Sequence, residues 1–276
     1  MKRYDQHLHS RHSFDCRSDP ADVVRHAIER GLDGITFTEH YDTHPDEAPT
    51  CIYDDAAYSD TISRLRDQFS DRIRVGKGIE VDYQKSHMPA IVEFIDCHAF
   101  DVVLLSVHWC YELPIHVRGS WDGADPAAVT RRYFYAVRDA LEHVRELHAG
   151  RPRVFDALSH LDFVKRYSLR FTGTQHVAGQ SDLIDDILRH CLAADVVPEV
   201  NTSTLRQGVG EAMPGPATVQ RYAALGGTML SIGSDAHKPE DVGADFTTAI
   251  DMLRAAGIDA TAVYVNRDRR RELIDA

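Results

Sequence analysis

The 276-residue sequence contains few cysteines and no long hydrophobic run. Its five cysteines are an odd number without a Cys-x-x-Cys pair, which argues against a disulfide framework or a cysteine-built zinc knot. No run approaches ~18 apolar residues, so the sequence lacks a membrane-spanning helix, and residues 1–25 lack the apolar stretch of a signal peptide. We therefore expect a cytoplasmic protein with free thiols.

Positive charge is also scarce. The chain has 31 Lys and Arg against 43 Asp and Glu, a formal net charge of −12. Nucleic acids and anionic membranes attract surfaces rich in Lys and Arg, so we expect neither as a partner. An acidic protein can still bind a small anionic substrate if metal ions or a local Arg/Lys cluster reverse the charge in the pocket.

Predicted strands and helices alternate along the whole chain. This alternation is typical of a parallel sheet with crossover helices, and about seven units are enough to close a barrel. No Pro/Ser-rich linker divides the chain, so we expect one domain over residues 1–276. After an opening strand, strands are expected at 34–38, 74–79, 101–107, 154–159, 196–200, 228–232 and 262–265. Helices are expected at 21–30, 54–69, 88–98, 126–148, 182–194, 217–225 and 245–256, and a charged tail at 266–276.

Metal-competent side chains gather at the ends of the predicted strands. His7 and His9 fall on the same side of the opening strand, because strand side chains alternate, and together they can grip a divalent metal. In parallel barrels the C-terminal strand ends converge on one face. Other histidines, such as His26 and His143, fall within helical patterns. The strand-end set is His7, His9, His40, Glu80, His108, His160, Asp235 and His237.

This ligand set is too large for a single ion. One zinc takes about four ligands, so the set implies two or three divalent ions, and mixed imidazole and carboxylate ligands suit Zn²⁺, Mn²⁺ or Fe²⁺. Clustered ions lower the pKa of a shared water and neutralise the oxygens of a transferring phosphoryl group. The pattern therefore indicates hydrolysis of a phosphate ester.

Six short motifs occur in a fixed order between residue 5 and about residue 243. They are His7-x-His9 with Asp15, Thr38-Glu39-His40, Gly78-Ile79-Glu80, Ser106-Val107-His108, Ser159-His160-Leu161-Asp162 and Ser234-Asp235-Ala236-His237. In this order they resemble the polymerase-and-histidinol-phosphatase (PHP) domain family. Residues 199–202 and 231–243 resemble its monofunctional histidinol-phosphatase branch in particular.

The resemblance implies a distorted (β/α)₇ barrel with its metal site at the C-terminal strand ends. Position 15 varies between His and Asp in the family, and His12 is a nearby competitor for that role; we expect Asp15. The implied ligands are His7, His9, Asp15, His40, Glu80, His108, His160, Asp235 and His237.

Three further residues match positions beside the metal site. Asp42 matches a position linked to proton transfer, and the alternative is a carboxylate that orients His40. Arg166 matches a phosphate-binding arginine of the branch, and the alternative is a surface charge. Asn201 either hydrogen-bonds substrate or a bound water, or satisfies the barrel rim.

The resemblance implies a metal-dependent phosphomonoesterase that hydrolyses L-histidinol phosphate, in histidine biosynthesis, by attack of a metal-bridging hydroxide. Asp42 or a metal-bound water would protonate the leaving alkoxide. The alternative is a PHP phosphoesterase for another small ester such as a nucleotide bisphosphate. An amidohydrolase also opens with His-x-His, but it usually needs a carboxylated lysine where this chain has Glu80.

The loop at residues 109–123 matches no part of the family pattern that we can assign. It flanks the expected pocket, so we expect it to shape substrate choice. Glu112 and Asp122 in this loop are candidates to recognise a cationic amine such as that of histidinol, and the alternative is that both are solvated.

Overall fold

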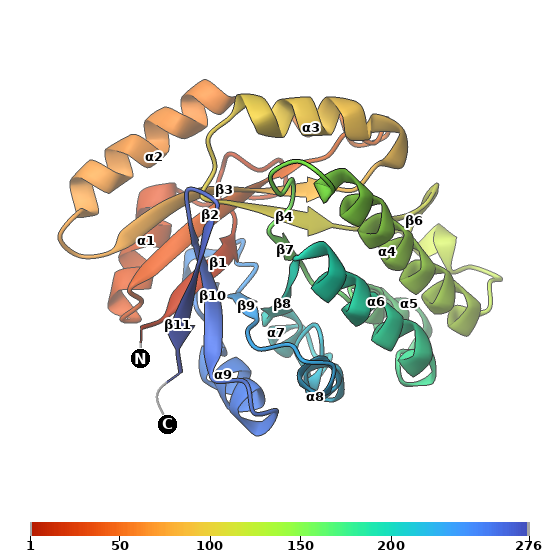
Figure 1. The fold of residues 1–276 in the computed structure, drawn as a ribbon. Coiled ribbons are helices and arrows are strands. Elements are labelled where there is room, and N and C mark those ends of the chain that lie inside the picture. The colour runs from red at the N-terminus through yellow and green to blue at the C-terminus, as the bar shows by residue number, and fades with distance from the viewer. Residues whose placement is uncertain (1, 275–276) are drawn as a thin grey trace.

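A parallel sheet that curls into a nearly closed barrel organises the protein (Figure 1). The computed structural model describes residues 2–274. All neighbouring strands of the sheet are parallel, in the order β1-β2-β3-β4-β7-β8-β9, which confirms the predicted barrel class. These strands are β1 (Tyr4–Leu8), β2 (Gly34–Tyr41), β3 (Arg74–Asp82), β4 (Val102–Ser106), β7 (Ala157–Leu158), β8 (Val197–Asn201) and β9 (Ser231–Gly233).

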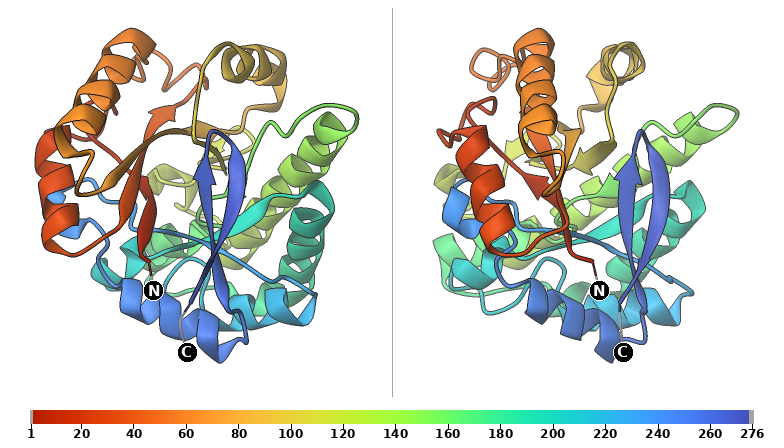
Figure 2. Two further views of the ribbon diagram at one scale, coloured as in Figure 1. Left: turned by 60° about the vertical axis from the view of Figure 1, so that its left-hand side comes forward. Right: turned by 90° about the vertical axis from the view of Figure 1, so that its left-hand side faces the viewer.

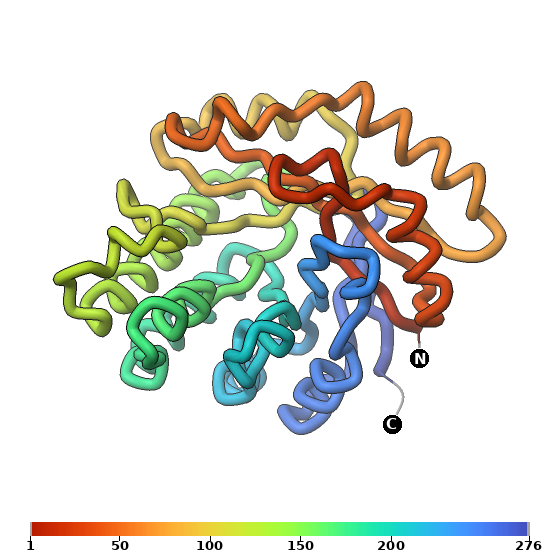
Figure 3. Tube along the Cα trace, turned by 180° about the vertical axis from the view of Figure 1, so that it is seen from behind, coloured from red at the N-terminus to blue at the C-terminus, as the bar shows by residue number. Residues whose placement is uncertain are grey.

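Backbone hydrogen bonds close the barrel between its first and last strands. The N–H of Asp235 donates to the carbonyl of His7 at 2.7 Å, and the N–H of His9 donates to the carbonyl of Ala236 at 2.9 Å. Seen from behind, the loops that follow β1 and β9 lie side by side (Figure 3), and the Ser18 hydroxyl donates to the His237 carbonyl across them. Two segments that lie more than 200 residues apart in sequence therefore meet at the C-terminal strand ends.

The helices cover the outside of the barrel (Figures 1 and 2). Asp19, Asp54 and Asp125 accept backbone hydrogen bonds at the starts of three helices, where such caps are favoured. Within residues 2–274, no helix combines the length and the apolar character needed to cross a membrane. The helices are α1 (Pro20–Glu29), α2 (Asp55–Phe69), α3 (Met88–Cys97), α4 (Pro126–His148), α5 (Val164–Thr172), α6 (Ser181–Ala194), α7 (Ser203–Arg206), α8 (Pro216–Ala224) and α9 (Phe246–Ala255).

The C-terminal segment is a hairpin, so the predicted charged tail at 266–276 is wrong as far as residue 274; residues 275 and 276 lie outside the described residues. β10 (Ala260–Val265) pairs antiparallel with β11 (Asp268–Leu273). Ala262 and Tyr264 of β10 pack on apolar side chains near the starts of β4 and β8. The Tyr264 hydroxyl also donates to the carbonyl of Asp156 at 3.0 Å. The hairpin thus covers the N-terminal end of the barrel, opposite the strand ends that carry the histidines.

Other parts of the chain also differ from the prediction, and two of them bear on the barrel. β7 is shorter than the expected strand at 154–159, and just before it the Asp156 carboxylate accepts a hydrogen bond from the N–H of Val103 at 2.9 Å. Helix α5 was not predicted because it carries several charged side chains. One of them, Lys165, is fully buried and pairs with Asp162 at 2.9 Å and Glu211 at 3.0 Å.

Candidate metal site

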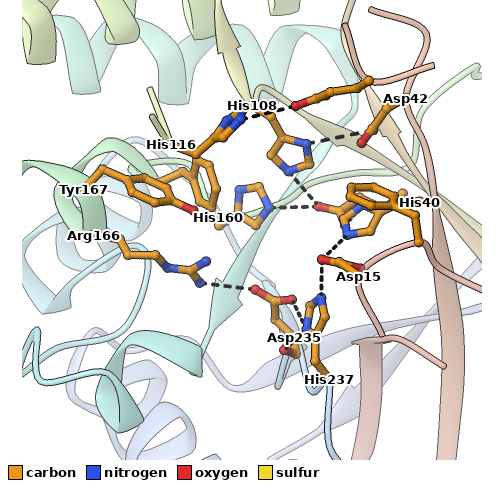
Figure 4. A pocket seen from close by; sticks show the side chains of 14 residues that line it. Asp15, His40, Asp42, His108, His116, His160, Arg166, Tyr167, Asp235 and His237 are labelled. Carbon is orange, nitrogen blue, oxygen red and sulfur yellow. Dashed lines mark hydrogen bonds and ion pairs between the residues drawn. The ribbon is translucent and has the colours of Figure 1, made fainter. Parts of the chain in front are cut away.

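A cavity of about 250 Å³ opens at the C-terminal ends of the strands, and imidazoles and carboxylates surround it (Figure 4). The register of the sheet explains the convergence, because Glu80 on β3 lies opposite His40 on β2. His108 and His160 follow β4 and β7, whose C-terminal ends point to the same face. Six of the eight predicted strand-end side chains line this cavity: His40, Glu80, His108, His160, Asp235 and His237. His7 and His9 lie behind them, in contact with Glu80.

The Glu80 carboxylate lies at the centre of this group. Its Oε2 atom is 3.2 Å from the Nε2 atom of His7 and 3.4 Å from that of His9. Its Oε1 atom is 2.8 Å from the Nε2 atom of His160 and 3.4 Å from that of His108. The two oxygens of one buried carboxylate thus face different sets of imidazoles.

Asp15 joins the cluster and His12 does not. The Oδ2 atom of Asp15 lies 3.0 Å from the Nε2 atom of His237 and 3.5 Å from that of His40. The ring of His12 instead bonds to the Thr61 hydroxyl at 3.1 Å. The geometry therefore favours Asp15 at the position where the sequence left two candidates.

Asp235 connects the histidines of β1 with the arginine of α5. Its Oδ1 atom lies 3.5 Å from the Nε2 atom of His9, and its Oδ2 atom lies 3.3 Å from the Nη2 atom of Arg166. Asp235 has a φ of 51°, a left-handed conformation that is uncommon for residues other than glycine and is found at ligand clamps. The strained turn directs the carboxylate into the cavity.

Several buried atoms of the cluster have no partner in hydrogen-bond geometry among the described residues: His7 Nε2, His9 Nε2, His40 Nδ1 and Asp42 Oδ1. Buried polar atoms are normally paired, because leaving them unpaired costs free energy. A divalent ion would satisfy these atoms, and imidazole and carboxylate ligands fit such an ion. Sets of three side chains with ligand atoms within 4.8 Å of one another are His9–His40–His237, His7–His9–Asp235, His7–Glu80–His160 and His40–Asp42–His108.

Two buried glutamates hold the Nδ1 atoms of His7 and His9, the ring nitrogens that face away from Glu80. Glu199 Oε1 lies 2.8 Å from His7 Nδ1. His9 Nδ1 lies 3.1 Å from the Ser13 hydroxyl, which donates to Glu39 at 2.6 Å. Such contacts fix which nitrogen faces a metal. These roles of Glu39 and Glu199 were not predicted, although an acid inside an otherwise apolar strand is a signal for such a role.

Ionisable side chains pack closely in the cluster and shift the pKa values of its histidines in opposite directions. Burial lowers the pKa of His9 to about 3, and the neighbouring His237 and His40 lower it as well. Burial also lowers the pKa of His40, but Glu80 and Asp15 outweigh it and raise that pKa to about 10. For Asp15, burial acts in the raising direction, yet hydrogen bonds from His237 and His40 hold its pKa well below the usual range. His9 is thus a neutral imidazole close to carboxylates that stay anionic.

Asp42 lies on the same cavity, directly after β2, and its side chain is buried. Its Oδ1 atom is 4.0 Å from the Nδ1 atom of His108, which is too far for a hydrogen bond, and its ligand atoms group with those of both His40 and His108. Burial raises the pKa of Asp42 to about 7; His40 and His108 act in the lowering direction, and Asp82 in the raising one.

Arg166 and Asn201 occupy different positions. Arg166 lines the cavity, and its Nη2 atom donates to the Ser203 hydroxyl at 2.6 Å. Asn201 is fully buried, and its side-chain amide lies 3.3 Å from Asp235 Oδ2 while its oxygen accepts from Ser203. Arg166 therefore faces the space for a ligand, whereas Asn201 supports Asp235 and Ser203, as expected of a residue that satisfies the barrel rim.

The loop after His108 contributes His116 to the cavity, as Figure 4 shows. Glu112 does not line the cavity and its side chain is 94 % exposed, and Asp122 is also exposed. The acid that lines this side is Glu47, from the loop between β2 and α2. Glu47 and His116 were not predicted as site residues, because neither lies near a predicted strand end.

The fold and the site together define a metal-binding barrel with imidazole and carboxylate ligands at its C-terminal strand ends. The chain belongs to the PHP domain family, whose model matches residues 5–203. It is 26% identical over 270 residues to a histidinol-phosphatase of Lactococcus lactis subsp. lactis (strain IL1403), covering 96% of this chain and 95% of that protein. It is also 26% identical over 269 residues to a histidinol-phosphatase of Bacillus subtilis (strain 168), covering 88% and 96%.

Solved structures share the fold. A histidinol phosphate phosphatase from Lactococcus lactis subsp. lactis, crystallised with zinc, L-histidinol and phosphate, superposes with a TM-score of 0.84 at 23% identity, over 98% of this chain and 99% of that one. A Listeria monocytogenes structure superposes with a TM-score of 0.76 at 18% identity, over 89% and 99%. The family and the barrel fold inferred from the sequence are thus confirmed.

Proposed function

We propose that this protein is a metal-dependent phosphomonoesterase that hydrolyses L-histidinol phosphate to L-histidinol and phosphate. The observation that carries the proposal is the cluster around Glu80, which shares one cavity with the guanidinium of Arg166. The family membership and the names of the two full-length relatives support the same activity.

The unpaired buried atoms of the cluster support a site for two or three divalent ions. When bound, such ions lower the pKa of water and neutralise phosphoryl oxygens. The carboxylates of the cluster offset the ions' charge, and Glu199 and the Ser13–Glu39 pair keep the ring nitrogens of His7 and His9 turned toward them. The proposed ligands are His7, His9, Asp15, His40, Glu80, His108, His160, Asp235 and His237.

Arg166 is the proposed phosphate-binding residue. Its Nη2 atom is held by Ser203 and Asp235, while its Nε atom is buried without a hydrogen-bond partner among the described residues. Its guanidinium also lies over the Phe163 ring, 5.0 Å from the ring centre, a contact that helps to hold it in place. A guanidinium fixed in this way donates to phosphoryl oxygens and stabilises the charge that they carry during the reaction.

Asp42 is the proposed acid for the leaving oxygen. Its carboxyl group is buried on the wall of the cavity, and its Oδ1 atom is unpaired. A carboxyl group within reach of the ester oxygen donates a proton as the bond to phosphorus breaks, so the alcohol leaves in neutral form.

Initial-rate measurements on a panel of phosphate esters test the proposal. The panel contains L-histidinol phosphate, a nucleoside bisphosphate and p-nitrophenyl phosphate, and released phosphate is measured for each. We expect the highest kcat/KM on L-histidinol phosphate. A preference of about tenfold or more for the nucleotide, equal to about 1.4 kcal/mol in barrier height, would overturn the substrate assignment while keeping the reaction class.

A further inference from the structure

Glu47 places a carboxylate on the side of the cavity formed by two loops. It belongs to the turn that follows β2, where its N–H donates to the carbonyl of His44 at 2.9 Å and its carbonyl accepts from the N–H of Cys51 at 3.0 Å. Its side chain lines the same cavity as the proposed metal ligands and is 17% exposed. The backbone hydrogen bonds of the turn thus fix the position from which Glu47 reaches the cavity.

The two oxygens of Glu47 differ in their surroundings. Oε1 lies 3.4 Å from the Nε2 atom of His116. Oε2 is buried and has no hydrogen-bond partner among the described residues. A buried carboxylate oxygen without a donor costs free energy, so a ligand that brings a donor or a positive charge would be favoured at this point.

The cavity therefore has two different polar groups on an aromatic wall. Arg166 presents a cation, and Glu47 presents an anion. Between them on the wall, the ring centres of Phe163 and Tyr167 lie 5.0 Å apart, and those of Tyr167 and His116 lie 6.4 Å apart. This arrangement complements a small ester that carries a phosphate, a flat ring and a cationic amine.

We propose that Glu47 binds the cationic amine of the leaving alcohol, with His116 holding the carboxylate in place. The inference rests on the proposed function and deepens it, because it assigns a residue to the part of the substrate that distinguishes an amino alcohol ester from other phosphate esters. It moves the expected amine contact from Glu112, which points into solvent, to Glu47, which faces the cavity.

The test compares Glu47→Gln with the unmodified protein on two esters, L-histidinol phosphate and the same imidazolylpropyl phosphate without the amine. Hydrogen bonds between charged groups are worth enough to change binding by about tenfold or more. We expect kcat/KM for the amine ester to fall by about tenfold or more, mainly through a higher KM, and kcat/KM for the amine-free ester to change less than about twofold. Glu112→Gln is the matched control and should leave both values unchanged.

An equal loss on both esters, or no loss on either, would overturn the assignment. Normal turnover of the amine-free ester also shows that the variant folds. If the unmodified protein does not hydrolyse L-histidinol phosphate, aminoethyl phosphate and ethyl phosphate replace the pair. A preference for the aminoethyl ester that Glu47→Gln abolishes would then support the amine site while the proposed substrate fails; no preference in either pair would refute the amine site.

Discussion

At the scale of single residues, Glu80 organises the site. Its Oε2 atom faces His7 and His9, and its Oε1 atom faces His108 and His160, so one carboxylate lies between two sets of ligands. Burial acts to raise the pKa of Glu80, but its contacts with His7, His40, His108 and His160 outweigh burial and hold this pKa well below the usual range. An anionic carboxylate whose two oxygens face different imidazoles would help to hold more than one ion.

Replacement of this carboxylate is expected to empty more than one ion position. Glu80→Gln keeps the shape of the side chain but removes the charge and turns one oxygen into an N–H donor that cannot ligate a metal. We expect the metal content per chain, measured by mass spectrometry of elements, to fall by more than one ion. Glu142→Gln on the exposed face of α4 is the control. Unchanged metal content in Glu80→Gln would show that Glu80 is not needed to hold the ions.

Asp42→Asn separates a proton donor from a positioning residue. An alkoxide leaving group needs a proton, whereas p-nitrophenolate leaves readily without one. We therefore expect kcat on L-histidinol phosphate to fall by about 100-fold or more, with a much smaller loss on p-nitrophenyl phosphate. Equal losses on the two esters would mean that Asp42 acts through His108, whose Nδ1 atom is 4.0 Å away, and not on the substrate.

The sequence predicted the strand-end residues and Asp15, but not Glu47 and His116, which lie in two other loops. His40, Glu80 and His108 were predictable because strand direction alone brings strand ends together. Glu47 and His116 were not, because their approach depends on the irregular paths of two loops that no periodicity describes. Glu199 contacts His7 although the two residues lie 192 positions apart in sequence. This contact could not be predicted because it forms only when the barrel closes.

At the scale of elements, the helices were easier to predict than the segments held by distant ion pairs. The helix expected at 126–148 coincides with α4, which Asp125 caps and Pro126 begins. α5 and β11 escaped prediction because their charged side chains find partners far along the chain. Examples are Lys165 with Glu211 in α5 and, in the turn before β11, Arg267 with Asp156.

The β10–β11 hairpin should contribute strongly to stability through Tyr264. This side chain is fully buried, packs at the N-terminal end of the barrel and donates to a barrel carbonyl. Truncation of a large buried ring leaves a cavity, so Tyr264→Ala should lower the free energy of unfolding by about 3–5 kcal/mol in urea titrations. Leu273→Ala, at a side chain that is 60% exposed on the same hairpin, should change it by less than about 0.5 kcal/mol. Equal effects would contradict the packing role.

The buried ring of His148, at the end of α4, should make the protein less stable in acid. Burial lowers its pKa from 6.5; its backbone contact with Ala194 acts in the raising direction and nearby Arg153 in the lowering one. Its ring bonds to the Ala194 carbonyl at 2.8 Å and accepts from the N–H of Val154 at 3.0 Å, which requires a neutral ring. As the pH falls below the pKa of an unperturbed histidine, this ring takes up a proton in the unfolded chain but not in the folded chain. The free energy of unfolding therefore decreases.

The measurement is urea unfolding of the protein and of His148→Gln at about pH 7.5 and about pH 5.5, on either side of the histidine reference value. We expect the free energy of unfolding to fall on acidification, and to fall less in the variant, because the variant lacks this titrating ring. Identical falls in the two proteins would show that His148 is not a source of the pH dependence.

At the scale of the whole molecule, the residues that stabilise the barrel and the residues of the proposed site lie at opposite ends of it. The hairpin and its apolar contacts occupy the N-terminal strand ends, and the histidine and carboxylate cluster occupies the C-terminal ends, the usual division in such barrels. The bonds between β1 and the segment after β9 both close the barrel and bring Asp235 to His7 and His9. The sequence predicted the barrel and this convergence from the order of its elements and motifs, whereas closure by the first and last strands required the structure.

The most direct test of the central claim is phosphate release from L-histidinol phosphate before metal removal, after chelation and dialysis, and after readdition of Zn²⁺, Mn²⁺ or Fe²⁺. We predict that chelation abolishes release, that one or more of the three ions restores it, and that a His9→Ala, His237→Ala double variant stays inactive under all three conditions. Normal turnover by the stripped protein or by the double variant would contradict the account.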